Sequence, residues 1–463
     1  MSGRGIDPQR GVVRASDPPH GIARSVSRPG DPLPATVELE HPESDLSPIA
    51  RVKQEGQRMD NRDRTEARIV DSRNLLIVLS KLEEESLIRD FCGTAISGSD
   101  PGPPSLAQKA VYLCGDLSKA RGLDLRAAGR IAVIRELSHG YEEDMTWPLV
   151  DLGRVPLRTH GVGVYYRRFF DLGTDYFSRI GSEHTFQSLT ESTKPGKAHR
   201  TGIYLTPVRQ DGDALHFRLL RCSTNLSGPT ENFRASDTHI VDALNREAGF
   251  LFEDQAPLNH ILAQIYHNTP AAAEQKQAKA RISAHADKTK DMPANGIMAF
   301  CTFYDRLDKL RPLTQDTFDY GYRGISGLTR LRFRLKEPAA QRLGPALPAQ
   351  FTLTLYPNSV FFMPLSTNRL YTHEILSPTL DAELLPTRLG YVVRCSSTEA
   401  VHKEGHTFLK RNGELVQLEP PTIEGMTELR RLYAEENRTQ AFIDYSSGFL
   451  FSMNGGDYIA PQV

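Results

Sequence analysis

The sequence predicts a mainly β protein with accessory helices, in which a β-sandwich or jelly-roll core follows a helical region and a disordered N-terminus. Three observations predict this order. The first 65 or so residues are rich in Pro, Arg, Ser, Gly and Asp, and apolar residues then recur at helix-like spacing from about Asp71. After Trp147, short runs of aromatic and aliphatic residues dominate to about Arg394, and such runs are typical of strands.

The chain has 463 residues, which suits two or three domains or one large catalytic domain with extensions. Lys and Arg (56) nearly balance Asp and Glu (57), so no global field draws the protein to nucleic acid or to an anionic membrane. Any polyanion binding must come from local patches. No apolar run is long enough to span a bilayer. The five cysteines form no CxxC pair, which favours free thiols in a reducing, intracellular compartment, the nucleus or the cytoplasm.

Residues 1–68 are predicted to form a disordered leader, because they cannot bury enough apolar surface to offset the entropy of the chain. Within the leader, the segment 1–30 has five arginines against two aspartates. It is interpreted as a flexible basic tail, and this composition leaves organelle targeting open as the alternative.

Residues 69–155 are predicted to form a helical accessory region. A stretch rich in Gly, Pro, Ser and Asp interrupts the helical pattern at 98–105, and the pattern resumes from about 106 to 139. The region carries no catalytic pattern and is expected to act as scaffold. The apolar residues of its first helical pattern include Leu75, Leu76, Val78, Leu79 and Leu82.

The strand-like segments that follow are short and rich in aromatic and aliphatic residues. They include 161–170 (GVGVYYRRFF), 202–208 (GIYLTPV) and 214–222 (ALHFRLLRC), and a helix is expected from about Asp237 to Glu247. Many short strands with few helices indicate a β-sandwich or jelly roll.

A candidate metal site begins at His285 and Asp287. In a chain with 14 histidines and 57 acidic residues a His-x-Asp/Glu triplet arises by chance, and this chain has three of them. This one precedes the strand-like run 296–304 (GIMAFCTFY). In an extended chain, residues two apart point to the same face, so the imidazole and the carboxylate can converge on one ion. One face of an octahedral iron needs a third ligand.

His373 is the candidate third ligand, and the segment after it strengthens the prediction. Arg388 and Arg394 lie an even number of positions apart on an apolar strand (RLGYVVR), so both side chains face the same way. Two arginines that face a sheet interior are costly unless they meet anions. A dicarboxylate such as 2-oxoglutarate supplies one carboxylate for each guanidinium.

Over roughly residues 200–400 the chain resembles the AlkB-type 2-oxoglutarate and Fe(II)-dependent dioxygenases. The order of the motifs, their spacing and the strands beside them all agree with that family. The segments that carry the resemblance are 219–233 (LLRCSTNLSGPTENF), 258–266 (LNHILAQIY), 282–304 (ISAHADKTKDMPANGIMAFCTFY), 358–375 (NSVFFMPLSTNRLYTHEI) and 388–394.

The resemblance implies a dioxygenase domain over 156–463, built as a double-stranded β-helix. It implies Fe(II) ligands at His285, Asp287 and His373, with O2 and 2-oxoglutarate as co-substrates. Tyr266 and Arg388 would bind the distal carboxylate of 2-oxoglutarate, and Gln264 and Arg394 would lie near the end that chelates iron.

The chain departs from the family at several positions. Gln264 stands where many members have Asn, Gly390 stands where relatives often carry a polar residue, and Thr289 replaces an acidic residue near the substrate base. The insertion 271–280 (AAAEQKQAKA) is expected to be a solvated loop or short helix. These departures put the substrate in doubt more than the chemistry.

A basic strand is expected at 328–336 (LTRLRFRLK), with Arg330, Arg332, Arg334 and Lys336 on one face and apolar residues on the other. Such a ribbon could meet a phosphate backbone, or it could be a solvated edge strand whose charges discourage aggregation. Aromatic residues between Tyr165 and Tyr204 lie where the family carries its substrate lid, and core packing explains most of them equally well.

The function that follows from the resemblance is oxidative. The leading hypothesis is an enzyme that demethylates N-alkylated bases in DNA or RNA, because a hydroxylated N-methyl group is released as formaldehyde. Nucleic acid is therefore the expected partner. A hydroxylase or demethylase of a protein or small molecule, and a non-catalytic binding module on the same fold, are the alternatives. The sequence indicates no oligomeric state.

Overall fold

The computed structural model describes residues 65–80, 85–99, 105–190, 197–221, 226–445 and 448–463. The predicted leader lies outside the described residues except for its last four. In these, Ala67 is buried, and strand β1 (Arg68–Ile69) pairs with β14 (Phe252–Glu253). The last four residues of the predicted leader are therefore part of the described fold.

The prediction of a helical region over 69–155 is wrong. The described part of this region forms a five-stranded sheet in the order β3-β2-β4-β5-β6, and every neighbouring pair is parallel. Its elements are β2 (Asn74–Val78), β3 (Thr94–Ser97), β4 (Ala110–Asp116), β5 (Arg130–His139), β6 (Leu149–Val150), the short helix α2 (Glu85–Asp90) and the 3-10 turns η1 (Leu117–Gly122) and η2 (Leu152–Arg154).

Strand β2 explains the error. Leu75 and Ile77 pack into one apolar cluster, whereas Leu76 packs into another, so the strand is buried on both faces. A parallel strand of this kind is a continuous apolar run without alternation. Such a run matches helical spacing as well as strand spacing.

The main body contains a nine-stranded sheet in the order β13-β10-β15-β25-β17-β23-β8-β7, with β9 paired to β10. All its pairs are antiparallel except β10 with β13. The strands are β7 (Leu157–Thr159), β8 (Gly163–Tyr166), β9 (Gln187–Thr190), β10 (Lys197–Thr206), β13 (Glu231–Asn232), β15 (His260–Tyr266), β17 (Ile297–Asp305), β23 (Ser359–Pro364) and β25 (Thr387–Arg394).

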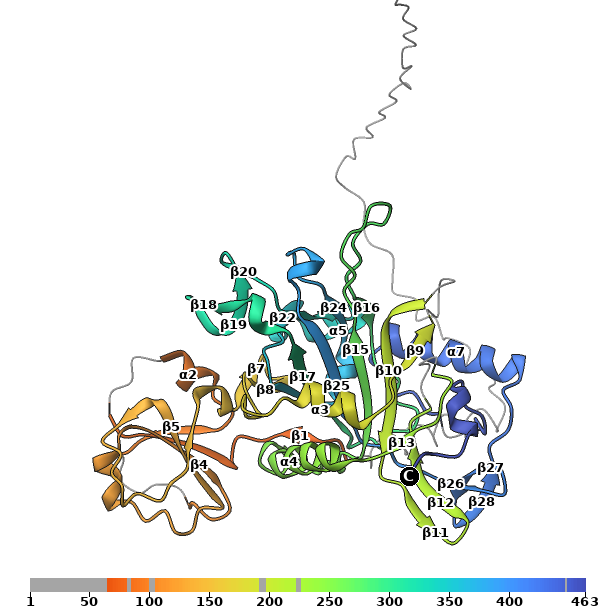
Figure 1. The fold of residues 1–463 in the computed structure, drawn as a ribbon. Helices are drawn as coiled ribbons and strands as arrows, with labels where there is room; N and C mark the ends of the chain where they lie inside the picture. Colours follow the sequence, from red (N-terminus) through yellow and green to blue (C-terminus); the bar gives the residue numbers. More distant parts are fainter. Residues whose placement is uncertain (1–64, 81–84, 100–104, 191–196, 222–225, 446–447) are drawn as a thin grey trace, which may run out of the picture. The chain divides into compact units, whose positions relative to one another are not determined.

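A four-stranded antiparallel sheet in the order β16-β24-β21-β22 packs on this large sheet (Figure 1). Phe300 and Phe361 from the large sheet share one apolar cluster with Phe333 and Phe351 from the small sheet. The mainly β class is therefore confirmed, and the jelly-roll connection remains a prediction. The small sheet comprises β16 (Ile282–His285), β21 (Arg330–Leu335), β22 (Gln350–Thr354) and β24 (Tyr371–Leu376).

Helices α3 (Tyr176–Glu183) and α4 (Ala235–Leu251) cover the other face of the large sheet. Ile180 and Leu244 from these helices share a cluster with Leu389 and Tyr391 of β25. The helix predicted at Asp237–Glu247 is confirmed and extends further at both ends. The aromatic residues considered for a lid are core residues instead, and they pack in or against three apolar clusters: Tyr165, Tyr166, Phe169, Phe170, Tyr176, Phe177 and Tyr204.

The remaining elements form two peripheral sheets and short helices. One sheet joins β11 (Arg209–Asp211), β12 (Ala214–Leu219), β26 (Thr398–Lys403), β27 (His406–Arg411) and β28 (Glu414–Gln417), and the other joins β18 (Arg311–Leu313), β19 (Asp316–Tyr322) and β20 (Ile325–Ser326). The helices are α5 (Glu337–Leu343), α6 (Leu365–Leu370) and α7 (Ile423–Arg438), with 3-10 turns η3 (Leu307–Lys309), η4 (Gly344–Ala346), η5 (Ala382–Leu384) and η6 (Gly455–Tyr458).

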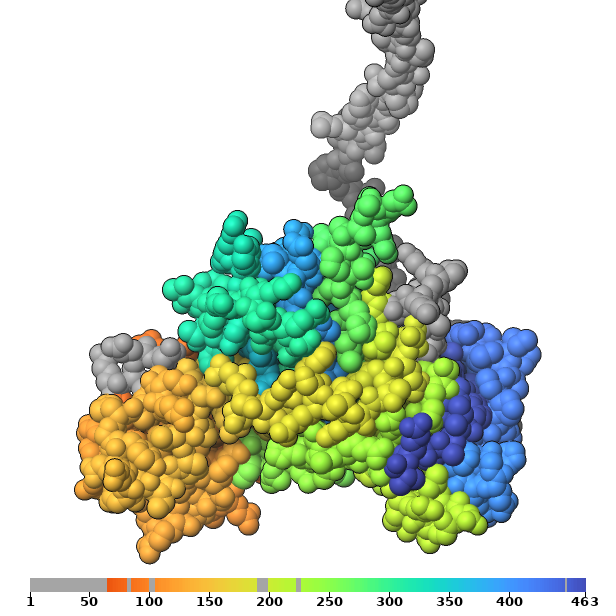
Figure 2. Space-filling view, viewed as in Figure 1, coloured from red at the N-terminus to blue at the C-terminus, as the bar shows by residue number. Residues whose placement is uncertain are grey.

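The insertion 271–280 is a narrow hairpin that stands out from the surface (Figure 2). Thr269 and Ala278 exchange two backbone hydrogen bonds, and so do Ala272 and Gln275. The expected exposure is confirmed, and the short helix is wrong. Over the described residues, no helix is both long and apolar enough to cross a membrane.

Candidate functional site

His285 and His373 meet because their strands pair. They are direct cross-strand partners of β16 and β24, with ring centroids 4.5 Å apart. His373 is buried, and the side chain of His285 is one-third exposed. Strand β16 ends at His285, so the small sheet presents one buried imidazole and one that is open to solvent.

Asp287 reaches the two histidines from the loop after β16, not from within the strand. Asn368 fixes this loop, because its side-chain oxygen accepts from Asp287 N (2.9 Å) and its amide donates to Asp287 O (2.9 Å). Asp287 Oδ1 lies 3.5 Å from His285 Nε2 and 3.8 Å from His373 Nε2. One ligand atom from each residue lies within 4.8 Å of the others, a separation that a single ion can bridge.

The protonation states suit a divalent metal. His285 Nδ1 donates to Ser283 O (2.8 Å), which leaves the lone pair of Nε2 for a ligand bond. Burial and the nearby His285 lower the pKa of His373 to about 3, so its ring is neutral at physiological pH. Burial opposes ionisation of Asp287, but the adjacent Arg394 guanidinium outweighs it and holds the pKa of this carboxyl well below its usual range.

Arg394 and Arg388 face the same side of the large sheet, as predicted. Arg394 Nη2 donates to Asp287 Oδ2 (2.7 Å), so its anion comes from within the protein. Arg388 is 5% exposed and makes no ion pair with any described carboxylate. Its guanidinium carbon lies 3.9 Å from the centre of the Tyr266 ring instead. A buried cation of this kind calls for an anion, which none of the described carboxylates supplies.

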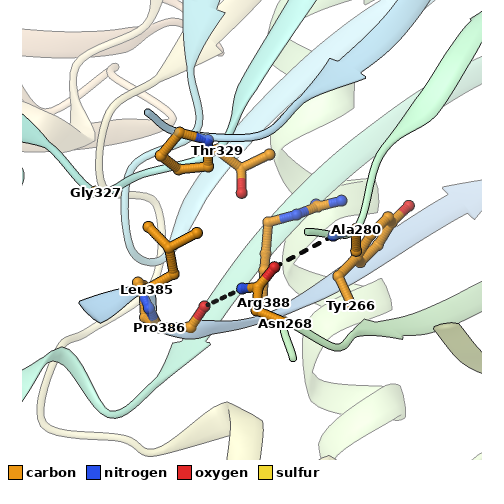
Figure 3. A pocket seen from close by; sticks show the side chains of 9 residues that line it. Tyr266, Asn268, Ala280, Gly327, Thr329, Leu385, Pro386 and Arg388 are labelled. Carbon is orange, nitrogen blue, oxygen red and sulfur yellow. Dashed lines mark hydrogen bonds between the residues drawn. The ribbon is translucent and has the colours of Figure 1, made fainter. Parts of the chain in front are cut away.

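A small surface hollow leads to Arg388, and Figure 3 shows Arg388 and Tyr266 side by side within it. Its empty volume is about 280 Å³, which includes open solvent at its mouth. Asn268 braces one wall by donating to Pro386 O (3.3 Å) and accepting from Ala280 N (3.2 Å).

Gly390 explains how the guanidinium of Arg388 fits. A Cβ at this position would lie 2.8 Å from Arg388 Nη1 and 3.0 Å from Tyr266 Cε2. The space that a side chain at position 390 would need is therefore filled by Arg388 itself. Gln264 is the cross-strand partner of Gly390, and its side-chain oxygen accepts from the Tyr266 hydroxyl (3.3 Å).

Several buried polar atoms on the facing sheet surfaces have no hydrogen-bond partner among the described residues. They include Arg388 Nε, Thr302 Oγ1 and His373 Nδ1. Thr302 pairs with Gly390 across β17 and β25, which places its hydroxyl on the strand pair that carries Arg388. Buried polar groups are normally satisfied, so this surface fits a ligand rich in oxygen atoms. A dicarboxylate meets that requirement, and two imidazoles with one carboxylate are a ligand set that suits iron.

Helix α7 holds the loop after β16, which carries Asp287, and the sequence did not indicate this contact. Ala286 N donates to Asn437 Oδ1 (2.7 Å), and Thr289 donates to Glu436 through both its backbone N and its hydroxyl. Farther along, Arg221 holds Asp291 through two guanidinium hydrogen bonds of 2.7 and 3.1 Å. These partners lie up to 151 positions away in the chain, so no local pattern indicates them.

The basic strand is only partly available for phosphate. Leu331 and Phe333 point into the core, so the predicted alternation is confirmed. However, Arg332 and Arg334 both pair with Glu374 on the neighbouring strand β24. The placement of Lys336 on the same surface is wrong.

Lys336 follows the end of β21 and is 5% exposed. It donates to three backbone oxygens, those of Glu436 (2.7 Å), Thr439 (3.1 Å) and Asn368 (3.2 Å). Burial lowers its pKa to about 8. Lys336 thus ties the end of α7 to the residue that fixes Asp287. Arg330 and Arg334 are the exposed cations of β21, and Arg334 pairs with Glu374.

A second titratable cluster lies around His184, away from the predicted site residues. Its ring nitrogens bond Glu231 and Asp237, each at 2.8 Å, and Tyr391 donates to Asp237 (2.6 Å). Glu183 completes a group with ligand spacing. Because both nitrogens of His184 are engaged by carboxylates, we interpret this cluster as a structural ion pair.

Comparisons with known proteins add little. No protein-family model matches the chain, and a search of curated proteins finds no match. One solved structure, described as that of the non-heme alpha ketoglutarate dependent epimerase SnoN from nogalamycin biosynthesis, is similar over 51% of this chain and 80% of that chain, at 12% identity and a TM-score of 0.26. A likeness at this TM-score carries no weight, so the interpretation of the site rests on its geometry.

Proposed function

We propose that this protein is an Fe(II)- and 2-oxoglutarate-dependent dioxygenase. The proposal rests on two features that lie between the same pair of sheets. One is a group of possible metal ligands, and the other is a buried arginine without a carboxylate partner among the described residues. The small sheet and its loop bring together two imidazoles and a carboxylate. The large sheet holds Arg388 buried without a carboxylate partner among the described residues.

Each residue has a distinct task in this proposal. His285, Asp287 and His373 would hold the iron, and Arg388 with Tyr266 would bind the distal carboxylate of 2-oxoglutarate. Arg394 keeps Asp287 ionised and aligned through its 2.7 Å hydrogen bond, and Gln264 orients the Tyr266 hydroxyl. The bound iron would supply the activation of O2, with 2-oxoglutarate converted to succinate and CO2 as one oxygen atom enters a C–H bond of the substrate.

Succinate formation tests this proposal directly. Purified protein incubated with Fe(II), ascorbate and 2-oxoglutarate should release succinate, and His285→Ala should abolish the release because one of three ligands is lost. The matched control is His406→Ala, which removes an exposed histidine of β27. Absence of succinate under every condition, or full activity in His285→Ala, would contradict the proposal.

We propose further that the oxidised group is an N-alkyl group on a nucleic-acid base. The resemblance over residues 200–400 supports this substrate class, and the exposed Arg330 gives one cation for a phosphate contact. The hydroxymethyl product of an N-methyl group breaks its C–N bond and leaves as formaldehyde, with the proton returned to nitrogen. Mass spectrometry of a panel of methylated nucleosides, before and after treatment, measures the loss of methyl groups.

The alternative substrates are a protein side chain or a small metabolite. The pairing of Arg332 and Arg334 with Glu374 favours them, because it reduces the charge that β21 offers to phosphate. Succinate release that no methylated DNA or RNA base stimulates would support this alternative and would exclude the demethylase.

A further inference from the structure

A second cleft lies at the junction of the accessory sheet and helix α4. On the sheet side it is lined by residues at the amino ends of three parallel strands: Ser72 and Arg73 before β2, Gln108 and Lys109 before β4, and Gly129 before β5. Arg246, Gly249 and Phe250 of α4 line the other side. The empty volume is about 1050 Å³, which includes open solvent.

The cleft is basic. Its lining includes Arg73, Lys109 and Arg246 and no acidic residue. None of the three cations forms an ion pair with a carboxylate in the described parts of the chain. The acidic residues nearest to Arg73 and Arg246 in the sequence have other partners. Asp71 pairs with Arg158, and Glu247 is buried and engaged by Arg130 and by the Tyr166 hydroxyl (2.5 Å). The positive charge of the cleft is therefore not neutralised by its own walls.

The walls are also fixed in place. Arg73 Nη1 donates to Gly249 O and Phe252 O, both at 2.8 Å, and Asn74 donates to Phe250 O (3.1 Å). These bonds join the first strand of the accessory sheet to the end of α4. One nitrogen of Arg73 is thus occupied by hydrogen bonds to the backbone. Lys109 is half-buried and Arg246 is exposed, so these two side chains can reorient towards a ligand.

We propose that this cleft binds a phosphate group. A compact ammonium beside a planar guanidinium suits a phosphoryl dianion, because the two groups together supply several charge-assisted donors. The ring of Phe250 provides an apolar wall next to the charged end. The phosphate could belong to a free nucleotide or to a nucleic-acid strand, and its chemistry is the same in both. This inference does not depend on the oxygenase proposal.

The test measures binding to the whole protein by calorimetric titration at fixed ionic strength. The probes are inorganic phosphate, adenosine monophosphate and a single-stranded oligonucleotide. The double variant Lys109→Gln/Arg246→Gln removes the two adaptable cations and leaves Arg73 to hold the walls. The matched control Lys276→Gln/Arg342→Gln removes two exposed cations elsewhere and gives the same net charge.

Saturable binding of at least one probe is expected, weakened at least ~10-fold in the cleft variant, since that variant loses the charge-assisted hydrogen bonds of two cations. Binding in the control should stay unchanged. The probe that binds most tightly identifies the source of the phosphate. No saturable binding of any probe, or equal weakening in both double variants, would overturn the proposal. Because succinate release is measured separately, this result and the failure of the oxygenase proposal are distinguishable.

Discussion

At the residue scale, the two arginines of β25 have different partners although they share one sheet face. Arg394 is satisfied by Asp287, whereas Arg388 stacks on Tyr266 and has no described carboxylate within ion-pair distance. The sequence predicted that both would need an anion from 2-oxoglutarate. In the structure Asp287 supplies one of these anions, and no described carboxylate supplies the other.

Gly390 gives a residue-scale prediction. Gly390→Ala should raise the KM for 2-oxoglutarate about tenfold, because a Cβ 2.8 Å from Arg388 Nη1 displaces the guanidinium and weakens one charge-assisted contact. The fold should survive, since the atom that must move belongs to a side chain. Steady-state succinate assays measure the change.

The matched control is Gly181→Ala in α3, where an added Cβ meets nothing within 4 Å. Its KM should equal that of the unmodified protein. An unchanged KM in Gly390→Ala would show that Arg388 does not contact the co-substrate.

At the element scale, the candidate metal site depends on four elements that lie far apart in the sequence. Strand β16 presents His285 and β24 presents His373, and helices α6 and α7 fix the loop that carries Asp287. The prediction used alternation within one strand to bring His285 and Asp287 together, whereas the pairing of β16 with β24 brings His285 to His373. Helix α7 lies after residues 388–394, the last segment that resembles the dioxygenases. No sequence motif indicates its contact with the loop.

Asn437 tests the role of α7. Asn437→Leu should weaken Fe(II) binding by ~10- to 100-fold, as is typical when a group that supports metal ligands is lost, because Ala286 N loses its acceptor. Asn437→Asp keeps an oxygen at the same place and should retain most of the affinity. Anaerobic Fe(II) titration with a competing chelator gives both values. Equal affinity in the Leu and Asp variants would show that α7 does not position the loop.

At the scale of the whole molecule, stability depends on pH through buried ion pairs. Burial disfavours the charged form of His184, but Asp237 and Glu231 outweigh it, so the pKa of His184 is raised above its ordinary value. A raised pKa in the folded state means that the stabilisation is full below the unfolded pKa of about 6.5 and is lost as pH rises through the folded pKa. Burial lowers the pKa of His260 to about 3, so its contribution acts below that window.

The urea midpoint of unfolding should therefore fall as pH rises from about 6.5 towards 8. Above this range Lys336, with a pKa lowered to about 8, contributes with the opposite sign. His184→Gln should remove the slope, because a glutamine does not titrate. If that variant fails to fold, NMR titration of the His184 ring in the unmodified protein gives the pKa directly. A flat midpoint with a His184 pKa at or below 6.5 would contradict the prediction.

The sequence by itself determined the mainly β class, helix α4, the alternation of β21 and the shared face of Arg388 and Arg394. These features follow from the spacing of apolar and polar residues over a short stretch of the chain. It also indicated His285, Asp287 and His373 as a set, although it placed Asp287 within a strand instead of a loop.

Only the tertiary structure decided which charges are neutralised and which elements meet. The accessory region was mistaken for helices because a strand buried on both faces has no alternation. Lys336 was predicted on a phosphate-binding surface, yet it is buried and donates hydrogen bonds to three backbone oxygens. Two of these oxygens belong to Glu436 in α7 and to Thr439, which follows the helix. Contacts across 100 or more positions depend on how the sheets and helices pack, and the spacing of residues along a chain does not contain that information.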